Sequence, residues 1–390
     1  MGKRTFVDIK EIASFNSLYN AWRLCSIGDG KDKRRDVIDF EKNLTANLKS
    51  LQKRLLNETW EPDTGRFFWL YTEGKWRHIH TVCIEDRIVH QALVYHFSLH
   101  KKFINRTFGS IKGRGTLKAN KQVRKDLHRS GFEYVIKLDA KKYYPNINKQ
   151  KLVELIRGKY KGEAALKLFE KIIMSYQPES ELGVSIGALP SQNNGNYYLT
   201  PFDYFVLQIL GVKYYSRYVD DMVILCETKE KAAEWIPKMK EFAAQFGITF
   251  GKIEVFPVSA RRIDFCGYAV GKNNVRLRKA TAMRFVRKLN CFDKHPAIDG
   301  MYERNSVCSY LGMLKYCDSY NLLKQLKNEH SEVFRRIDRY AKGKRGKGYE
   351  IASTTTGNRR IQKVLQSSRS RVGRNSRGQR ATRYRGRPVR

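Results

Sequence analysis

The sequence predicts an α+β fold, in which helical segments at both ends of the chain flank a central antiparallel sheet. Three observations predict this class. An apolar stripe at helical spacing is formed by Leu44, Leu48, Leu51 and Leu55. Residues 133–139 alternate between two faces, as a β-strand does. Residues 213–226 contain two strand-like runs that meet at a short bend.

Helices are expected over the first 60 residues, ending near Pro62, which lacks the N–H needed to continue a helix. The expected elements that follow are a hairpin at 66–80, a helix at 85–99, a glycine-rich basic loop at 108–116, helices within 149–177, a turn at 183–192, a helix at 193–210, a helix at 232–246, strands at 253–256, 263–270 and 275–277, and helices at 281–340. Predicted helices therefore both precede and follow the predicted sheet strands along the chain.

The charge of the chain indicates a polyanionic partner. Its formal net charge is +38, and residues 341–390 hold 16 Lys and Arg against one acid, Glu350. The first 340 residues therefore still carry +23. Nucleic acid is the first candidate for the partner. An anionic membrane is the second, although no amphipathic basic helix stands out. The tail either binds RNA phosphates or is solvated and without fixed structure until a partner binds.

The seven cysteines show no C-x-x-C spacing and no nearby histidine cluster, which argues against structural zinc and a disulfide framework. Reduced thiols fit a cytosolic protein better. No signal-peptide core is present, and no run approaches 18 apolar residues. We therefore expect a soluble, cytoplasmic protein without a membrane association.

Three aspartates at the ends of predicted strands are the main functional signal. Asp220 and Asp221 lie at the bend of the 213–226 hairpin, and Asp139 closes the strand at 133–139. Neighbouring carboxylates repel one another and lose hydration when buried, so a cation is expected among them. The alternatives are an exposed Asp-Asp turn and an Asp139 that only caps the next turn.

This set of acids suits phosphoryl transfer with two metal ions, in which Mg²⁺ ions about 4 Å apart activate a hydroxyl and neutralise a leaving phosphate. Magnesium prefers hard oxygen ligands and keeps several waters, so a few aspartates suffice. Manganese is expected to be able to substitute. Lys75 and Arg77, two residues apart on one strand, project from the same face and could grip a triphosphate, or could simply face solvent.

With these residues in place, the chain resembles reverse transcriptases. Tyr218-Val219-Asp220-Asp221 is similar to the motif at their catalytic centre, and Asp139 resembles their other metal-binding aspartate. The order of the blocks also fits, over about residues 15–325. The resemblance implies a right-hand polymerase with the following parts: N-terminal helices and fingers (1–132), palm (133–145 and 191–277), a fingers insertion (146–190), a helical thumb (278–340) and a basic tail (341–390).

One motif differs from that of most bacterial reverse transcriptases and limits the resemblance to a smaller group of these enzymes. Residues 186–192 read Ile-Gly-Ala-Leu-Pro-Ser-Gln, where most bacterial reverse transcriptases, including group II intron enzymes, have QGxxxSP. The IGxxxSQ form resembles the enzymes of diversity-generating retroelements. That resemblance implies error-prone copying of a structured template-repeat RNA into cDNA, with mutations at adenines, and a small helical accessory protein that is expected to be oligomeric. The Ile186 side chain could contact an incoming base only through its shape, because it cannot form a hydrogen bond. The alternative is that Ile186 only packs within the turn.

The resemblance also implies roles for single residues. Asp139 and Asp220 would hold both metals, with a contribution from the Ala140 carbonyl and support from Asp221. The residues implied around the incoming dNTP are Lys75, Arg77, Ala140, Tyr144, Ile186, Gly187, Ser191, Gln192 and Lys252. Tyr144 would exclude a ribose 2′-OH by its bulk, or else is only core packing. The alternatives for the whole chain are a group II intron or retron-type enzyme, or a catalytically idle RNA-binding protein.

Overall fold

The computed structural model describes residues 3–28, 30–63, 65–72, 74–298 and 300–345. The chain divides into two compact units, which we describe separately. The first comprises Met1–Ala282 and Leu314–Ser319, and the second comprises Met283–Met313 and Tyr320–Arg390. The predicted basic tail lies outside the described residues from 346 onward. No helix in the described ranges is long and apolar enough to cross a membrane.

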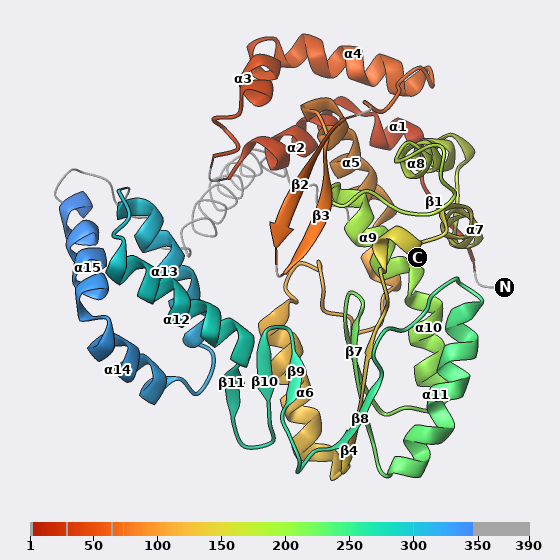
Figure 1. Cartoon of the computed structure of the whole chain (residues 1–390). Coiled ribbons are helices and arrows are strands. Elements are labelled where there is room, and N and C mark those ends of the chain that lie inside the picture. The colour runs from red at the N-terminus through yellow and green to blue at the C-terminus, as the bar shows by residue number, and fades with distance from the viewer. Residues whose placement is uncertain (1–2, 29, 64, 73, 299, 346–390) are drawn as a thin grey trace, which may run out of the picture. The chain divides into compact units, whose positions relative to one another are not determined.

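The N-terminal part of the first unit is helical, as predicted (Figure 1). Its helices are α1 (Ile9–Ile12), α2 (Phe15–Ser26), α3 (Arg35–Lys42), α4 (Leu44–Leu56) and α5 (Ile84–Phe97). Leu48, Leu51 and Leu55 are buried on α4, which confirms the predicted apolar stripe. The last helix before Pro62 ends six residues earlier than predicted, at Leu56, where the backbone of Asn57 leaves the helical region.

A two-stranded hairpin joins α4 to α5. Its strands are β2 (Arg66–Thr72) and β3 (Lys75–Thr81), and their register pairs Leu70 with Arg77. A short parallel strand pair, β1 (Thr5–Phe6) with β5 (Tyr160–Lys161), connects the N-terminus to the segment that follows residue 159. The remaining helical elements of this region are η1 (Leu99–Lys102), η2 (Tyr144–Asn146), α7 (Lys149–Lys159), α8 (Glu163–Met174), α9 (Leu189–Tyr198), α10 (Thr200–Tyr204) and η3 (Phe205–Ile209).

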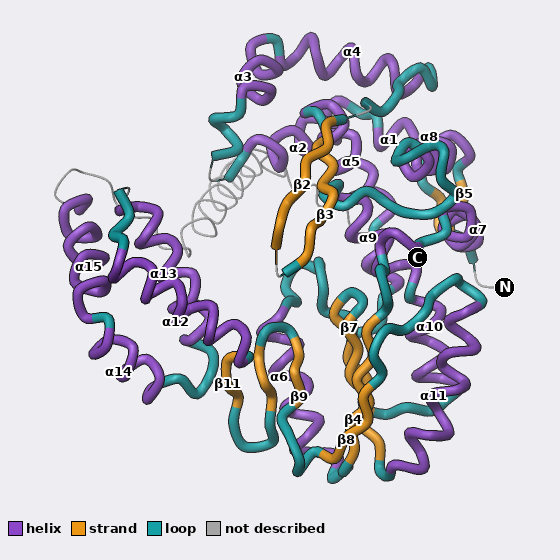
Figure 2. The backbone as a smooth tube through the Cα atoms, in the orientation of Figure 1, coloured by secondary structure: helices purple, strands orange, loops and turns teal. Residues whose placement is uncertain are grey.

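The central sheet has four strands in the order β6-β7-β4-β8 (Figure 2). Its strands are β4 (Tyr134–Asp139), β6 (Tyr214–Tyr218), β7 (Asp221–Cys226) and β8 (Glu254–Pro257), and each neighbouring pair is antiparallel. The helices α6 (Thr116–Ser130) and α11 (Lys229–Ala244) both contact this sheet and cover opposite faces. Alternation predicted β4, whereas a continuous apolar run predicted β7, whose residues 222–226 are all buried.

Some elements differ from the sequence prediction. Helix α6 was not predicted, because its narrow buried face lies among many Lys and Arg residues. The helix expected at 193–210 starts at Leu189, since a proline is tolerated in the first helical turn. The single strand expected at 263–270 is a hairpin of β9 (Ile263–Phe265) and β10 (Tyr268–Val270), followed by β11 (Val275–Leu277). Cys266 and Gly267, both with positive φ, make the turn between β9 and β10.

The second unit is helical, as predicted for this part of the chain. Its helices are α12 (Lys279–Lys294), which begins in the first unit, α13 (Gly300–Leu314), α14 (Tyr320–Glu329) and α15 (Ser331–Arg345). Phe285 and Leu289 on α12 and Val333 on α15 are fully buried. The buried carboxylate of Glu303 accepts hydrogen bonds from Arg336, whose guanidinium also reaches the Phe292 carbonyl at 2.9 Å.

Candidate active site

The strand register brings the three predicted aspartates to one end of the central sheet. Asp139, the last residue of β4, lies directly opposite Asp221, the first residue of β7. Asp220 occupies the two-residue turn between β6 and β7, and its carbonyl accepts a hydrogen bond from the Ala140 N–H at 3.3 Å. Residues separated by 81 positions in the sequence therefore meet, as a shared metal site requires.

The electrostatics at this end of the sheet favour a cation. Burial raises the pKa of Asp220, and the charge of Asp139 raises it further. The charges of Arg77 and Lys137 act in the opposite direction, so both cations lie close enough to influence this carboxyl group. Two hard carboxylates that repel one another at a partly exposed strand end match the oxygen ligands of Mg²⁺. Asp139 and Asp220 therefore fit a divalent ion.

Asp221 has a different setting. Its carboxylate contacts the ammonium group of Lys137, which lies on β4 two residues before Asp139 and on the same face. Burial lowers the pKa of Lys137 to about 8. Across the described ranges, no group of three or more His, Cys, Asp or Glu side chains is arranged to hold a metal. The Asp221 carboxylate thus has a cationic partner, whereas Asp139 and Asp220 repel one another.

The β2–β3 hairpin is joined to the predicted 183–192 turn by a backbone hydrogen bond. The His80 N–H on β3 donates to the Ile186 carbonyl at 2.9 Å, and the His80 side chain pairs with Ser185 at 2.9 Å. A Cβ atom added to Gly187 would lie 2.5 Å from the His80 carbonyl oxygen, so only glycine fits there. The Ile186-Gly187 turn is therefore fixed against the strand that carries Lys75 and Arg77.

Tyr144 lies between the aspartates and α9. Burial raises its pKa to about 12, with a further contribution from the charge of Asp220. A Cβ added to Gly195 would come within 3.1 Å of the Tyr144 ring, so the ring packs closely on the α9 backbone. Its neighbour Tyr143 donates a hydrogen bond to the Gly195 carbonyl at 2.5 Å. The structure thus brings Tyr144 near Asp220, and its ring orientation is set by packing.

Three other predicted residues, Ser191, Gln192 and Lys252, differ in burial and in their contacts. Ser191 is buried at 5% exposure and lines an internal cavity, whereas its neighbour Gln192 is exposed. The ammonium group of Lys252 pairs with Glu254 at 2.5 Å on an 81% exposed side chain. The hydrogen bond from Lys252 lowers the pKa of Glu254. Lys252 follows Gly251, whose N–H donates to the Asp139 carbonyl at 2.8 Å.

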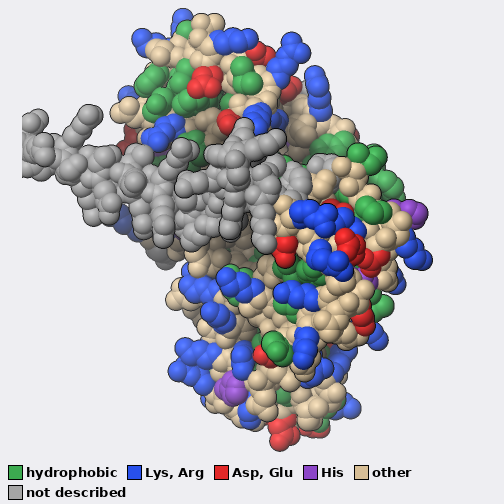
Figure 3. All heavy atoms as spheres, turned by 90° about the vertical axis from the view of Figure 1, so that its left-hand side faces the viewer, with side chains coloured by type: hydrophobic (Ala, Val, Ile, Leu, Met, Phe, Trp, Pro, Cys, Tyr) green, Lys and Arg blue, Asp and Glu red, His purple; other side chains and the backbone are tan. Residues whose placement is uncertain are grey.

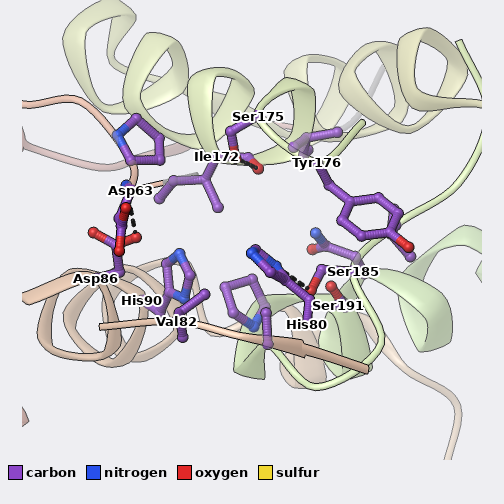
Figure 4. A pocket seen from close by; sticks show the side chains of 16 residues that line it. Asp63, His80, Val82, Asp86, His90, Ile172, Ser175, Tyr176, Ser185 and Ser191 are labelled. Atoms are coloured by element: carbon purple, nitrogen blue, oxygen red, sulfur yellow. Dashed lines mark hydrogen bonds between the residues drawn. The ribbon is translucent and has the colours of Figure 1, made fainter. Parts of the chain in front are cut away.

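The cavity that Ser191 lines lies behind the Ile186-Gly187 turn (Figure 4). It measures about 20 Å³, which is enough for about one water molecule. The titratable side chains that line it include His80, Asp86 and His90. Burial lowers the pKa of His90 to about 3 and raises that of Asp86 to about 6. Burial therefore holds the His90 imidazole neutral, whereas the Asp86 carboxyl still ionises as the pH rises above about 6.

Sequence reasoning assigned no role to Lys137, Arg217 or Asp203. The period-two alternation of residues 133–139 does place Lys137 on the same face as Asp139, but it does not reveal the contact with Asp221. Arg217 and Asp203 form a fully buried ion pair behind the turn, with 2.5 Å between the Arg217 Nη2 and an Asp203 oxygen. No local pattern links two residues on a strand and on a helix before the fold is known.

Residues 62–270 match the family described as reverse transcriptase (RNA-dependent DNA polymerase). This match covers more than half of the chain, so the chain belongs to that family. The mixed helix and strand architecture is accordingly that of a right-hand polymerase. No curated protein matches the chain.

Two solved telomerase structures are similar to part of the chain. The apo telomerase from Candida tropicalis, truncated from its C-terminal domain, shares 13% identity at a TM-score of 0.42, over 55% of each chain. The telomerase from Candida albicans in complex with a TWJ fragment of telomeric RNA shares 12% identity at a TM-score of 0.46, over 71% of this chain and 55% of that one. The chain thus spans about half the length of these solved relatives.

Proposed function

We propose that this protein is the reverse transcriptase of a diversity-generating retroelement, which copies a structured template-repeat RNA into adenine-mutagenised cDNA by two-metal nucleotidyl transfer. The observation that carries the polymerase assignment is the register pair of Asp139 with Asp221, with Asp220 in the adjoining turn. The family match over residues 62–270 supports the same reaction class. The retroelement type rests on the IGxxxSQ form of residues 186–192.

In this proposal, Asp139 and Asp220 hold two Mg²⁺ ions, with the Ala140 carbonyl as a further oxygen ligand and Asp221 as support. Bound Mg²⁺ would lower the pKa of the primer hydroxyl and neutralise the leaving pyrophosphate. Mn²⁺ would substitute, because it also accepts hard oxygen ligands. Lys137 would keep the Asp221 carboxylate oriented, since the two side chains are in contact.

The incoming dNTP would bind between the fingers hairpin and the end of the sheet. Lys75 and Arg77 would bind its triphosphate, and the influence of Arg77 on the pKa of Asp220 supports this placement. Tyr144 would exclude a 2′-OH by its bulk. Ile186, Gly187, Ser191 and Gln192 would shape the pocket around the base, and Lys252 would protonate the pyrophosphate.

Template binding is supported by the charge of the chain, which is +38. On the face drawn in Figure 3, Lys and Arg side chains are spread widely over the described surface. Phosphate contacts from such residues make affinity fall with salt concentration. The partners would be the template RNA, the cDNA and an oligomeric helical accessory protein, in the cytoplasm, and the RNA would serve as both primer and template.

The Ile186 side chain is the proposed cause of low fidelity. The His80 hydrogen bond fixes the Ile186 carbonyl, so its apolar side chain is held at a defined position without a polar group to test base pairing. A glutamine could form such a hydrogen bond. Loss of one favourable polar contact reduces discrimination by roughly 10-fold.

The test is primer extension on an RNA template, followed by sequencing of the cDNA. The Ile186→Gln variant should reduce errors at template adenines by about 10-fold, while errors at other bases change little. Ile186→Val is the matched control, because it alters shape without adding a polar group, and its error spectrum should resemble that of the wild type. An even spread of wild-type errors over all four template bases would instead favour a group II intron or retron-type enzyme. No extension at all would favour an idle RNA-binding protein.

A further inference from the structure

The turn that carries Asp220 has a backbone conformation which its own sequence disfavours. Val219 and Asp220 form a two-residue hairpin loop, and Val219 has a φ of +57°. Short hairpin loops need a positive φ to match the twist of their strands, and glycine or asparagine normally supplies it. A β-branched residue at positive φ is a steric outlier. Such a conformation persists only where neighbouring groups hold it in place.

The Arg217 side chain is the first of these neighbouring groups. It is fully buried, and its Nη1 donates a hydrogen bond to the Val219 carbonyl at 2.8 Å. The same guanidinium is fixed from behind by Asp203, which accepts from Nε at 2.7 Å and from Nη2 at 2.5 Å. Tyr215 donates to the same carboxylate at 2.6 Å. Because Asp203 binds the planar guanidinium along its Nε–Nη2 edge, the group has little freedom left and Nη1 is aimed at the turn.

The Gly109 backbone holds the other side of Val219. A Cβ on Gly109 would lie 2.5 Å from Val219 Cγ2 and 3.0 Å from the Val219 nitrogen. Asn196 connects the two supports, because it accepts a hydrogen bond from Arg217 at 3.1 Å and donates one to the Gly109 carbonyl at 2.8 Å. Val219 is thus enclosed between a fixed guanidinium and a fixed stretch of backbone.

We infer that Arg217 is a positioning residue for nucleotide addition, which acts by holding Val219 in its left-handed conformation so that Asp220 and Asp221 face Asp139. Asp203 orients Arg217 for this task. The inference rests on the proposed polymerase function, because Arg217 is fully buried and acts through the turn that it contacts. It assigns the buried Arg217–Asp203 ion pair a role in catalysis in addition to any effect on folding stability.

The first variant to test is Arg217→Lys, which keeps a positive charge beside Asp203 but cannot hold the carboxylate and the Val219 carbonyl in one plane. Single-nucleotide incorporation should show a maximal rate about 100-fold below that of the wild type, as expected when reacting groups shift by about 1 Å. The KM for dNTP should stay within about 3-fold of the wild-type value, because substrate binding is not removed.

A second substitution separates positioning from general stability. Adding Val219→Gly to Arg217→Lys removes the steric cost of the positive φ, and should recover about 5- to 10-fold of the lost rate. Adding Val219→Ala should not, because alanine keeps the cost of the left-handed conformation. Equal recovery by glycine and alanine, or no recovery by glycine, would overturn the inference.

Two controls complete the experiment. Leu48→Ala on α4 removes a fully buried side chain far along the chain from the turn, and should lower the Tm while leaving the maximal rate nearly unchanged. Hydrogen exchange of the segment 214–226 should be faster in Arg217→Lys and unchanged in Leu48→Ala. If the wild type fails to extend primers, the proposed function falls, yet the exchange measurement still tests the inference. Unchanged exchange in Arg217→Lys would overturn it.

Discussion

The end of the palm sheet and the cavity behind the fingers both bury polar groups, but they stabilise them in opposite ways. At the sheet, the fully buried Arg217 keeps its charge because Asp203 and two carbonyl groups accept its hydrogen bonds. In the cavity, burial without a counterion holds His90 neutral. Within the described ranges, the His90 Nδ1 and an Asn194 oxygen have no hydrogen-bond partner.

This difference indicates where the protein needs side chains held in one orientation. A paired buried ion is costly to desolvate and is retained where it fixes orientation, which is what the turn of Asp220 requires. Among the described residues, His90 and Asp86 lie in the cavity without such a partner for their charged forms, so their burial affects folding rather than orientation. Changes to Arg217 and its partners should therefore affect the rate of nucleotide addition, whereas changes to Asp86 should affect stability.

The largest effect is expected from Asp220→Asn, which removes a charged metal ligand and keeps the shape of the turn. The rate of primer extension in Mg²⁺ should fall by at least about 10³-fold, as expected when a charge that stabilises the transition state is lost. Binding of the RNA template should change little. Extension at the wild-type rate would rule out the two-aspartate site.

An intermediate effect is expected from Gly109→Ala, which tests the same turn from its other side. The new methyl group would overlap Val219, so the turn must move, and incorporation should slow by roughly 10- to 100-fold. Gly158→Ala on α7 is the matched control, because a Cβ there meets nothing within 4 Å and alanine favours the helix. Similar rates for the two variants would show that the Val219 contact is not needed.

The smallest effect, and one on stability alone, is expected from Asp86→Asn in the cavity. Burial raises the folded-state pKa of Asp86 to about 6, so the wild type loses stability as pH rises from about 4 to about 6. An asparagine does not titrate, and its amide oxygen can still accept the Asp63 N–H, which donates at 3.0 Å. The variant should gain on the order of 1–3 kcal/mol above pH 6.

Thermal unfolding checks this prediction at two pH values. The Tm of Asp86→Asn should exceed that of the wild type by a few degrees at pH 7.5, and the difference should shrink toward pH 4. Primer extension should be unaffected at 25 °C. A gain of equal size at both pH values would show that the charge of Asp86 is not its cause.

The amino-acid sequence by itself determined the strands of the palm, the N-terminal helices and the three aspartates, because alternation, helical spacing and like-charge repulsion are local properties. The pairing of Asp139 with Asp221 could be expected from two strand ends, and the register confirmed it. The alternation of residues 133–139 also placed Lys137 on the face of Asp139. It did not predict the contact with Asp221, because a lysine on a half-buried strand can equally extend into solvent.

Only the tertiary structure decided how the turn is held. Arg217, Asp203, Asn196 and Gly109 come from separate segments, and their hydrogen bonds exist only after the sheet and α9–α10 have packed together. The same is true of the left-handed Val219, which no local preference would predict. A strained backbone is stable only when long-range contacts enforce it, so its position cannot be read from its neighbours in sequence.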